Sequence, residues 1–167
     1  ELPVGRALPG GRGLLHLPLV TGVMTAIHRD VAAARAGREP RVLARLASGW
    51  AVFGAQQFVR GYLLLLPDPV VPQLNSLEGV ARVQFLADMA RLGDALLAVT
   101  AAARINYAIF GNVEPALHAH VIPRYADEPA GLRTAQPWAY DWAQAAPFDA
   151  AALVDLAAAL RQALEPR

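Results

Sequence analysis

The sequence contains no cysteine and no lysine. The first absence excludes disulfides, thiolate nucleophiles and cysteine-based metal sites. The second excludes Schiff-base chemistry on a lysine, because all 15 basic residues are arginine. The 14 acidic residues leave a formal net charge of +1, and no long basic run is present. A duplex nucleic-acid binder needs a concentrated positive face, so the composition argues against that class of partner.

The chain also lacks any apolar run near the ~20 residues that a membrane span requires. The most apolar early stretch, residues 14–26, is interrupted by His16 and Pro18. We therefore expect no membrane partner and a cytoplasmic location. With 167 residues, 55% of them hydrophobic, the chain is long enough to bury a core, and disorder of the whole chain is excluded.

The order of patterns predicts an α+β fold with one main domain. Residues 1–20 hold three prolines and four glycines and are predicted to form an irregular arm, so the domain is expected over 21–165. A first helix is expected over 21–37, from an N-cap at Thr21 to a stop at Gly37.

Five strands, mainly antiparallel, and two further helices are expected downstream. Asn75 with Glu78 forms a capping-box pattern for the long helix, and Pro123 is expected to end the last strand. The predicted strands are 42–46, 50–53, 58–66, 105–109 and 116–122, and the predicted helices are 75–102 and 148–164. Strands, one long helix and strands again are typical of an α+β arrangement rather than a doubly wound sheet.

Two histidines two residues apart carry the most informative chemistry. His118 and His120 lie in a predicted strand, so both imidazoles point to the same face while Leu117, Ala119 and Val121 point to the core. Each imidazole can influence the protonation of the other. The preceding Gly111-Asn112 pair permits a tight turn whose backbone N–H groups can face an anion.

The residues alone leave three interpretations open. The pair can be two zinc ligands, which would require a third and fourth ligand such as Asp127 or Glu128. It can be two ordinary histidines on a half-exposed strand. It can also serve nucleophilic catalysis, with one imidazole attacking phosphorus.

The segment Ala116-Leu117-His118-Ala119-His120-Val121-Ile122-Pro123-Arg124 resembles the signature of the histidine triad (HIT) superfamily. That signature is His-φ-His-φ-His-φ-φ, where φ is apolar, often followed by Pro-Arg. The chain is most similar to a bacterial HIT-like branch in which Gly-Asn precedes the motif and Tyr follows Pro-Arg. The preceding hairpin over 48–63 also resembles the family, so the likeness covers about residues 40–130.

The resemblance implies a nucleotide bound against a five-stranded antiparallel sheet, in a protein that usually forms homodimers. It implies a nucleotide hydrolase or nucleotidyl transferase acting at the α-phosphate through a covalent nucleotidyl-histidine, with no cofactor. His118 is the implied nucleophile and His120 its neighbour at the phosphate or leaving group. Asn106, Gly111 and Asn112 are the implied phosphate-region residues.

The chain departs from the family pattern at three positions. Ala116 stands where the first triad histidine is found, Tyr62 where many members have a further histidine, and Val113 where a hydroxyl is common. These changes keep two alternatives open: a nucleotide-binding or regulatory protein with little turnover, and a metal-binding protein that uses His118 and His120.

Three more residues are candidates for substrate contacts. Trp50 and Gln57 can line a base or ribose pocket, since ligand sites combine aromatic walls with a few polar groups. Arg124 is a candidate phosphate clamp. Trp138, Tyr140 and Trp142 are expected to cover the core or a dimer interface rather than to bind a ligand. A homodimer is expected because a small sheet with apolar strands does not leave a flat edge bare.

Overall fold

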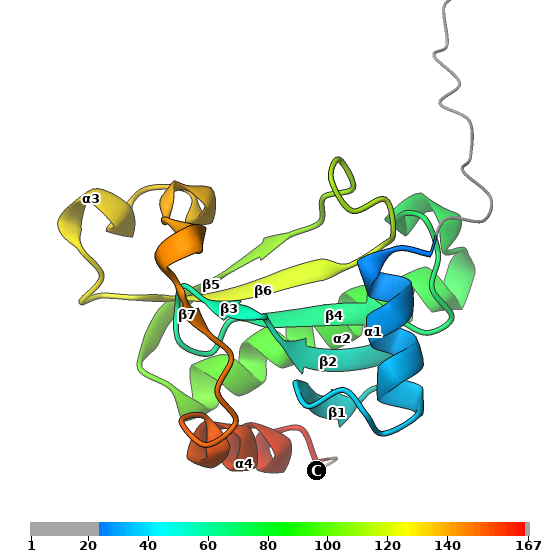
Figure 1. Ribbon diagram of the computed structural model, residues 1–167, viewed down its shortest axis with the longest axis horizontal. Coiled ribbons are helices and arrows are strands. Elements are labelled where there is room, and N and C mark those ends of the chain that lie inside the picture. The colour runs from blue at the N-terminus through cyan, green and yellow to red at the C-terminus, as the bar shows by residue number, and fades with distance from the viewer. Residues whose placement is uncertain (1–23, 166–167) are drawn as a thin grey trace, which may run out of the picture.

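The computed structural model describes residues 24–165 and has an α+β fold (Figure 1). Five antiparallel strands form the main sheet in the order β1-β2-β4-β6-β5. These are β1 (Val42–Arg45), β2 (Gly49–Phe53), β4 (Leu63–Pro67), β5 (Ala102–Ala108) and β6 (Ala119–Tyr125). The short strands β3 (Gln56–Gln57) and β7 (Ala146–Pro147) pair separately. The helices are α1 (Ala26–Arg35), α2 (Gly79–Val99), α3 (Ala130–Arg133) and α4 (Val154–Ala163). The expected α+β class and five-stranded sheet are confirmed.

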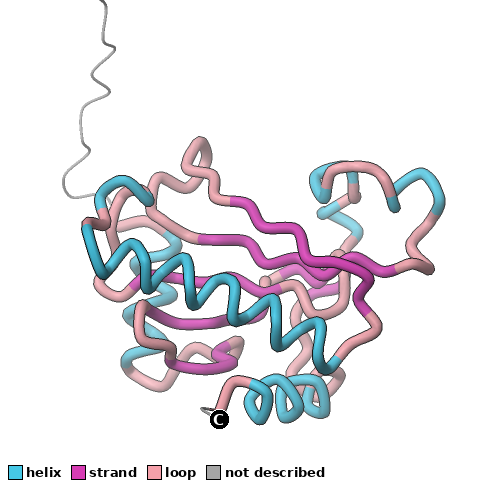
Figure 2. Tube along the Cα trace, turned by 180° about the vertical axis from the view of Figure 1, so that it is seen from behind, coloured by secondary structure: helices cyan, strands magenta, loops and turns pink. Residues whose placement is uncertain are grey.

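One face of the sheet is covered by α2 and α4, as the view from behind shows (Figure 2). Apolar residues spaced by four and three positions along α2 pack here, with Phe85, Leu92 and Leu96 fully buried. The strand predicted over 116–122 begins only at Ala119; Leu117 just before it and Ala119 and Val121 within it enter the same core. The predicted division of that strand into a core face and an imidazole face is therefore confirmed.

Within residues 24–165, the opposite face of the sheet is covered only at its two ends. At one end α1 packs through Ile27 and Val31 against Val52, Leu66 and Ala116. At the other end the chain that follows β6 folds back in short helical turns, including the 3-10 turns at Pro137–Ala139 and Trp142–Gln144 (Figure 1). The histidines lie between these two covers.

The strand predicted over 58–66 is shorter than expected and begins only at Leu63. Tyr62 N–H donates to Val59 O in a turn, and Gly61 adopts a φ of 89°, a left-handed conformation that glycine takes without strain. The turn places Tyr62 at the start of β4, on the sheet face that carries His120, so the deviation shapes the site.

The helix boundaries also differ from the prediction. The capping box at Asn75 does not form, because Leu74–Ser76 is a 3-10 turn and α2 begins at Gly79. The same helix ends at Val99, where Thr100 donates through both its N–H and its hydroxyl to Leu96 O. The freed residues join β5, which begins at Ala102 rather than 105. The last helix, α4, begins six residues later than predicted.

The first helix is capped by Thr25, whose hydroxyl accepts from His28 N–H. The predicted cap, Thr21, and the predicted arm over 1–20 lie outside the described residues. Gly37 has a φ of 66° just after the helix, which confirms its role as a stop. Among the described residues, no helix is long and apolar enough to cross a membrane.

Pro123 does not end its strand, contrary to the prediction. It lies inside β6 opposite Ile105 of β5. β6 pairs with β4 only from Ala119 to Val121, so Pro123 lies past the start of β4 and its missing N–H removes no bond to that strand. The strand consequently continues to Tyr125 and carries Arg124 away from the histidines.

Candidate active site

His118 and His120 project from the beginning of β6 onto the sheet face that α2 does not cover. His118 lies in the extended segment just before the strand and is 8% exposed. The two imidazole rings are 4.9 Å apart between centroids and meet edge to face. The two-residue spacing thus brings both rings to one site, as the sequence predicted.

The ring orientation of His118 is set by its own backbone. Its Nδ1 lies 2.8 Å from Ala116 O. A carbonyl can only accept, so Nδ1 carries a proton, and in the neutral imidazole the lone pair is then on Nε2. The side chain at position 116 takes no part in this bond. An imidazole held in this tautomer is a nucleophile or a base at Nε2.

His120 is held by a tyrosine from the neighbouring strand. Tyr62 is 3% exposed, and its hydroxyl lies 2.6 Å from His120 Nδ1. Burial raises the pKa of Tyr62, while burial and the neighbouring His118 lower the pKa of His120 to about 4. The phenol is therefore protonated and the imidazole neutral at pH 7. Because the phenol O–H has no other acceptor among the described residues, we assign it as the donor to Nδ1, which makes Nε2–H of His120 a donor.

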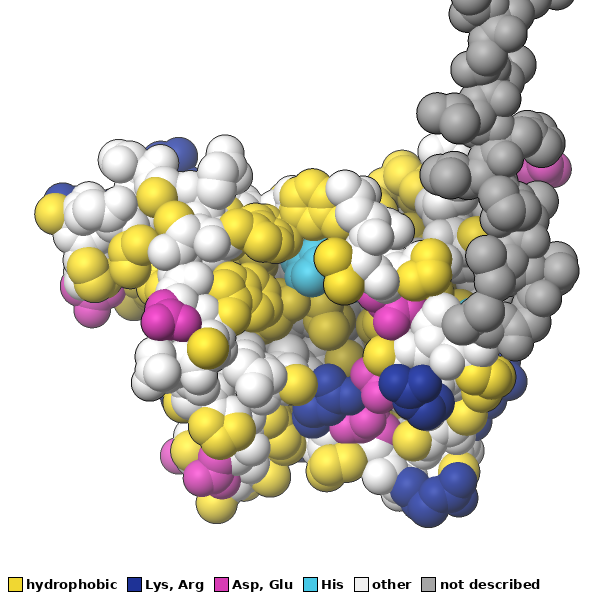
Figure 3. Space-filling model, turned by 45° about the horizontal axis from the view of Figure 1, so that its top comes forward, with side chains coloured by type: hydrophobic (Ala, Val, Ile, Leu, Met, Phe, Trp, Pro, Cys, Tyr) yellow, Lys and Arg dark blue, Asp and Glu magenta, His cyan; other side chains and the backbone are white. Residues whose placement is uncertain are grey.

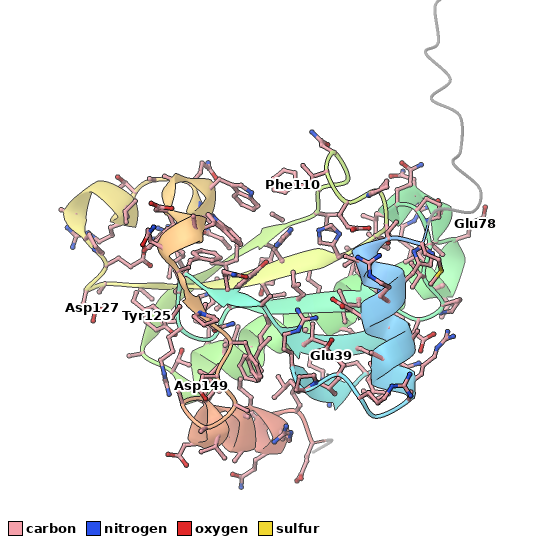
Figure 4. All side chains as sticks on the ribbon, in the orientation of Figure 1. Glu39, Glu78, Phe110, Tyr125, Asp127 and Asp149 are labelled. Atoms are coloured by element: carbon pink, nitrogen blue, oxygen red, sulfur yellow. The ribbon has the colours of Figure 1, made fainter. Side chains whose placement is uncertain are left out.

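A cavity of about 380 Å³ opens beside the two histidines. Figure 3 shows a histidine at the bottom of a hollow bordered mainly by hydrophobic side chains. The cavity is lined by Phe110, Asn112, Val113, Glu114, His118, His120 and Trp138. Five of them, His118 included, belong to the segment between β5 and β6, at whose base Phe110 is labelled in Figure 4.

The walls of the cavity differ in chemistry. On one side the rings of Phe110 and Trp138 pack edge to face with centroids 4.7 Å apart, and both lie beside His120. On the other side Glu114 accepts a hydrogen bond from Ala26 N–H of α1. The cavity therefore combines an aromatic surface, two imidazoles and a carboxylate.

The loop residues predicted from the sequence lie at or near this cavity. Asn112 lines it, and Gly111 lines an adjoining pocket that also contains Phe110 and Asn112. The Gly-Asn turn is therefore brought to the histidines.

Arg124 and Asn106 lie at the other end of β6 and do not line the cavity. The Arg124 guanidinium donates to Glu128, to Asn106 Oδ1 and to the carbonyls of Leu132 and Ala135. Arg124 is 6% exposed, and its hydrogen bonds attach the chain after β6 to the sheet. This chain segment also carries Trp138, so Arg124 supports one wall of the cavity from a distance.

Trp50 and Gln57 are likewise engaged elsewhere. Trp50 Nε1–H donates to Asp68, and the Arg45 guanidinium lies over the indole ring. The Gln57 amide bridges Gly54 O, Tyr62 O and Gly61 N–H, which fixes the turn before β4. Gln57 thus positions Tyr62 rather than lining the cavity.

The sequence did not indicate Phe110, Glu114 or Trp138 as cavity residues. Phe110 and Glu114 flank the Gly-Asn turn, so their short distance along the chain from the histidines was the available signal. Trp138 comes from a distant segment and was expected to cover the core or a dimer interface. It is 44% exposed and its ring lies 5.5 Å from that of His120.

The described residues offer His118 and His120 no further ligand for a metal ion. Within residues 24–165, no group of three or more histidine and acidic residues is arranged to hold a metal ion. Glu128, the candidate third ligand, is hydrogen-bonded to Arg124 and Tyr140 instead.

The sequence matches no protein-family model and no curated protein. Comparison of the fold with solved structures does find similar proteins. A histidine triad protein of Bradyrhizobium japonicum is 25% identical, with a TM-score of 0.65 over 74% of this chain and 90% of that chain. One from Marinobacter aquaeolei is 19% identical, with a TM-score of 0.66 over 84% and 96%. A hypothetical histidine triad nucleotide-binding protein of Sulfolobus tokodaii is 13% identical, with a TM-score of 0.63 over 81% and 90%.

These neighbours share the sheet and helix arrangement that carries the His118–His120 strand, and their coverage extends over nearly their whole length. The motif at residues 116–124 independently indicates the same family. The chain therefore has the fold of histidine triad proteins, and its residues 116–124 resemble their motif.

Proposed function

We propose that the protein is a nucleotide hydrolase or nucleotidyl transferase that acts at the α-phosphate through His118. The observation that carries the proposal is the 2.8 Å hydrogen bond between His118 Nδ1 and Ala116 O. This bond leaves the Nε2 lone pair for attack, in a cavity large enough for part of a small ligand. The likeness in fold to a nucleotide-binding neighbour supports a nucleotide as the ligand class.

The proposed reaction has two steps. In the first, the Nε2 lone pair of His118 attacks the α-phosphorus, an N–P bond forms, and the bond from phosphorus to the leaving oxygen or nitrogen breaks. The leaving group takes that electron pair and a proton from solvent water, and the proton that the second acceptor loses later restores the balance. In the second, water or another acceptor attacks phosphorus, the N–P bond breaks, and His118 is regenerated.

His120 has a separate role in this scheme. Its Nε2–H donates toward the cavity because Tyr62 occupies Nδ1. A donor aimed at the phosphoryl oxygens stabilises the negative charge that develops on them in the transition state. The backbone of the Gly111-Asn112 turn can add further N–H donors beside the cavity.

The alternative is a nucleotide-binding protein with little turnover. It is favoured by Ala116, which stands in place of the first triad histidine, is 1% exposed and packs against α1. Since the carbonyl of this residue, not its side chain, orients His118, we favour the enzyme over the binding protein.

Turnover of a fluorogenic nucleoside phosphoramidate tests the proposal. The wild type should release the fluorophore, and His118→Ala should abolish release while nucleotide binding is largely retained. His118→Asn is the matched variant, because its amide keeps a donor near the position of Nδ1. Equal rates in wild type and both variants would contradict the proposal. Nucleotide binding without turnover would favour the binding protein.

We also propose a homodimer. The outer face of α2 exposes Val80, Val83 and Leu97, apolar side chains that a second copy can cover. Light scattering at micromolar concentration should give twice the chain mass, and a monomer would contradict this proposal. The cytoplasmic location expected from the sequence stays a prediction.

A further inference from the structure

We infer that a second pocket, remote from the histidines, binds the phosphate group of a small molecule. This pocket has a volume of about 540 Å³ and lies where β5 begins, where β6 ends and where the chain leaves α3. We call it the arginine pocket, and the polar side chains that line it include Arg104, Asn106, Arg124, Arg133, Thr134 and Gln136. The inference is independent of the chemistry proposed for His118.

The arginine pocket is separate from the cavity beside the histidines. The two have no lining residue in common. Arg124 follows His120 by four residues on β6, which corresponds to about 13 Å at ~3.3 Å per residue. Tyr125, which lines the arginine pocket, and Phe110, which lines the cavity, lie well apart in Figure 4. One phosphate group therefore cannot occupy both places.

Two arginines bring uncompensated positive charge to this pocket. Arg104 lies directly opposite Arg124 in the pairing of β5 with β6, a relation in which like charges destabilise a sheet. Glu128 forms an ion pair with Arg124. Among the described residues, neither Arg104 nor Arg133 forms an ion pair, and no acidic side chain lines the pocket. A bound anion would supply the charge that both arginines lack.

The hydrogen bonds of Arg124 determine which groups are left to contact a ligand. Every N–H group of its guanidinium already has an acceptor in the protein, so Arg124 shapes the pocket without binding the anion itself. One of these acceptors is Asn106 Oδ1, at 2.9 Å. Because arginine only donates, the oxygen of the Asn106 amide faces Arg124 and the Nδ2 group keeps its donors. Nδ2 has no partner among the described residues and is not buried, so Asn106 offers these donors in the pocket that it lines.

Arg133 supplies a guanidinium that is anchored by one bond and otherwise free. Its Nη1 donates to Ala126 O at 3.2 Å, and Ala126 also lines the arginine pocket, so this bond places the guanidinium at the pocket wall. Its other N–H groups have no acceptor among the described residues. Arg104 comes from β5, on the sheet face that it shares with Arg124. Donors for an anion therefore come from the sheet and from the chain at the end of α3.

A phosphate group matches this arrangement better than a carboxylate. Its tetrahedral oxygens accept from several directions, whereas a planar carboxylate is best recognised by a single guanidinium fork. A small molecule matches it better than a nucleic acid. The pocket has a limited volume and the chain a net charge of only +1, while nucleic-acid binding needs a wide positive face.

Titration of the full-length chain with sodium pyrophosphate, followed by two-dimensional ¹H–¹⁵N NMR, tests the inference. The amide signals of residues 103–106 and 133–136 should shift together and yield one dissociation constant. Arg104→Gln and Arg133→Gln should each weaken this binding about fivefold or more, because each removes a charge-assisted hydrogen bond.

Arg38→Gln is the matched control. Arg38 is an exposed arginine just after α1, outside the arginine pocket. Its replacement removes the same charge and should leave the dissociation constant within about twofold.

Four outcomes would overturn the inference. The first is the absence of shifts at millimolar pyrophosphate, or shifts confined to residues 110–120 around the histidines. The second is an equal loss of binding in Arg38→Gln and in the two pocket variants, which would show attraction by net charge alone. The third is binding of citrate, which has a similar charge, as tightly as pyrophosphate. The fourth is tighter binding of a ten-nucleotide oligothymidylate at the same residues, which would indicate a nucleic-acid partner.

Discussion

The hydroxyl of Tyr62 and Nδ1 of His120 are joined by a hydrogen bond of 2.6 Å between two neighbouring strands. Their rings are nearly parallel, with an interplanar angle of 7°. Because Tyr62 is buried and protonated, the bond fixes both the tautomer and the orientation of His120. Tyr62, at a position where the resemblance to histidine triad proteins implies a histidine in many members, is therefore part of the candidate site.

Replacing Tyr62 by Phe should leave Nδ1 of His120 without its donor. The expected loss of stability is about 1–3 kcal/mol, the cost of an unpaired buried acceptor. The ¹⁵N chemical shifts of His120 should show a mixture of tautomers instead of one. Tyr107→Phe is the matched control and should change neither quantity, because this tyrosine on the edge strand β5 is 42% exposed and packs against Gly93 of α2, away from the histidines. An unchanged His120 tautomer in Tyr62→Phe would contradict the assigned hydrogen bond.

Stability should decrease with acid in a window set by His120. Burial and His118 lower its folded-state pKa from 6.5 to about 4, so the unfolded chain binds a proton that the folded chain does not. The free energy of unfolding is then at its full value above about pH 6.5. It falls by up to about 3 kcal/mol as the pH drops toward 4. Urea unfolding of the wild type and of His120→Asn measures this. Identical slopes in that pH window would show that His120 is not the responsible group.

Glu128→Gln should destabilise the protein strongly. Arg124 and Glu128 form a pair whose side chains are only 8% and 6% exposed. Burial would raise the pKa of Glu128, but hydrogen bonds from Arg124 and Tyr140 lower it below its ordinary value. Removing one charge leaves the other buried, which costs about 3–5 kcal/mol. Glu78→Gln, an exposed position without a capping bond, should change stability by less than about 0.5 kcal/mol in urea unfolding.

Two glycines should respond oppositely to alanine. A Cβ at Gly49 would lie 1.9 Å from the backbone oxygen of Leu66 in the paired strand β4, which cannot move without breaking the sheet. A Cβ at Gly131 meets nothing within 4 Å. Gly49→Ala should therefore lower the melting temperature by about ten degrees or more, given a scale of ~4 °C per kcal/mol of lost stability. Gly131→Ala should not lower the melting temperature. Similar melting temperatures would contradict the close approach of β2 and β4.

Local patterns predicted much of the fold and the centre of the site. Alternation assigned Leu117, Ala119 and Val121 to the core and both imidazoles to one face. Apolar residues that recur every three or four positions along α2 indicate which side of this helix is buried. Both patterns depend on neighbours within one element, which is why the sequence alone carries them.

Features that depend on tertiary context were not predictable in this way. Pro123 lies within β6 because β4 begins only opposite Val121, a relation between distant segments. Trp138 reaches the cavity because Arg124 holds the preceding turns against the sheet. Glu114 belongs to the site through Ala26 of α1, which is 88 residues away in the chain. None of these contacts leaves a periodic signal.

The central claim is that His118 Nε2 becomes bonded to phosphorus. Intact-mass spectrometry after mixing with a panel of adenylate and guanylate esters and amidates, quenched within the first turnover, tests it most directly. The wild type should gain the mass of one nucleotidyl group, located at His118 by fragmentation, and His118→Asn should gain none. An adduct on a residue other than His118 would contradict the claim. Turnover of any of these compounds would also contradict it if the wild type forms no adduct and His118→Asn turns the compound over equally fast.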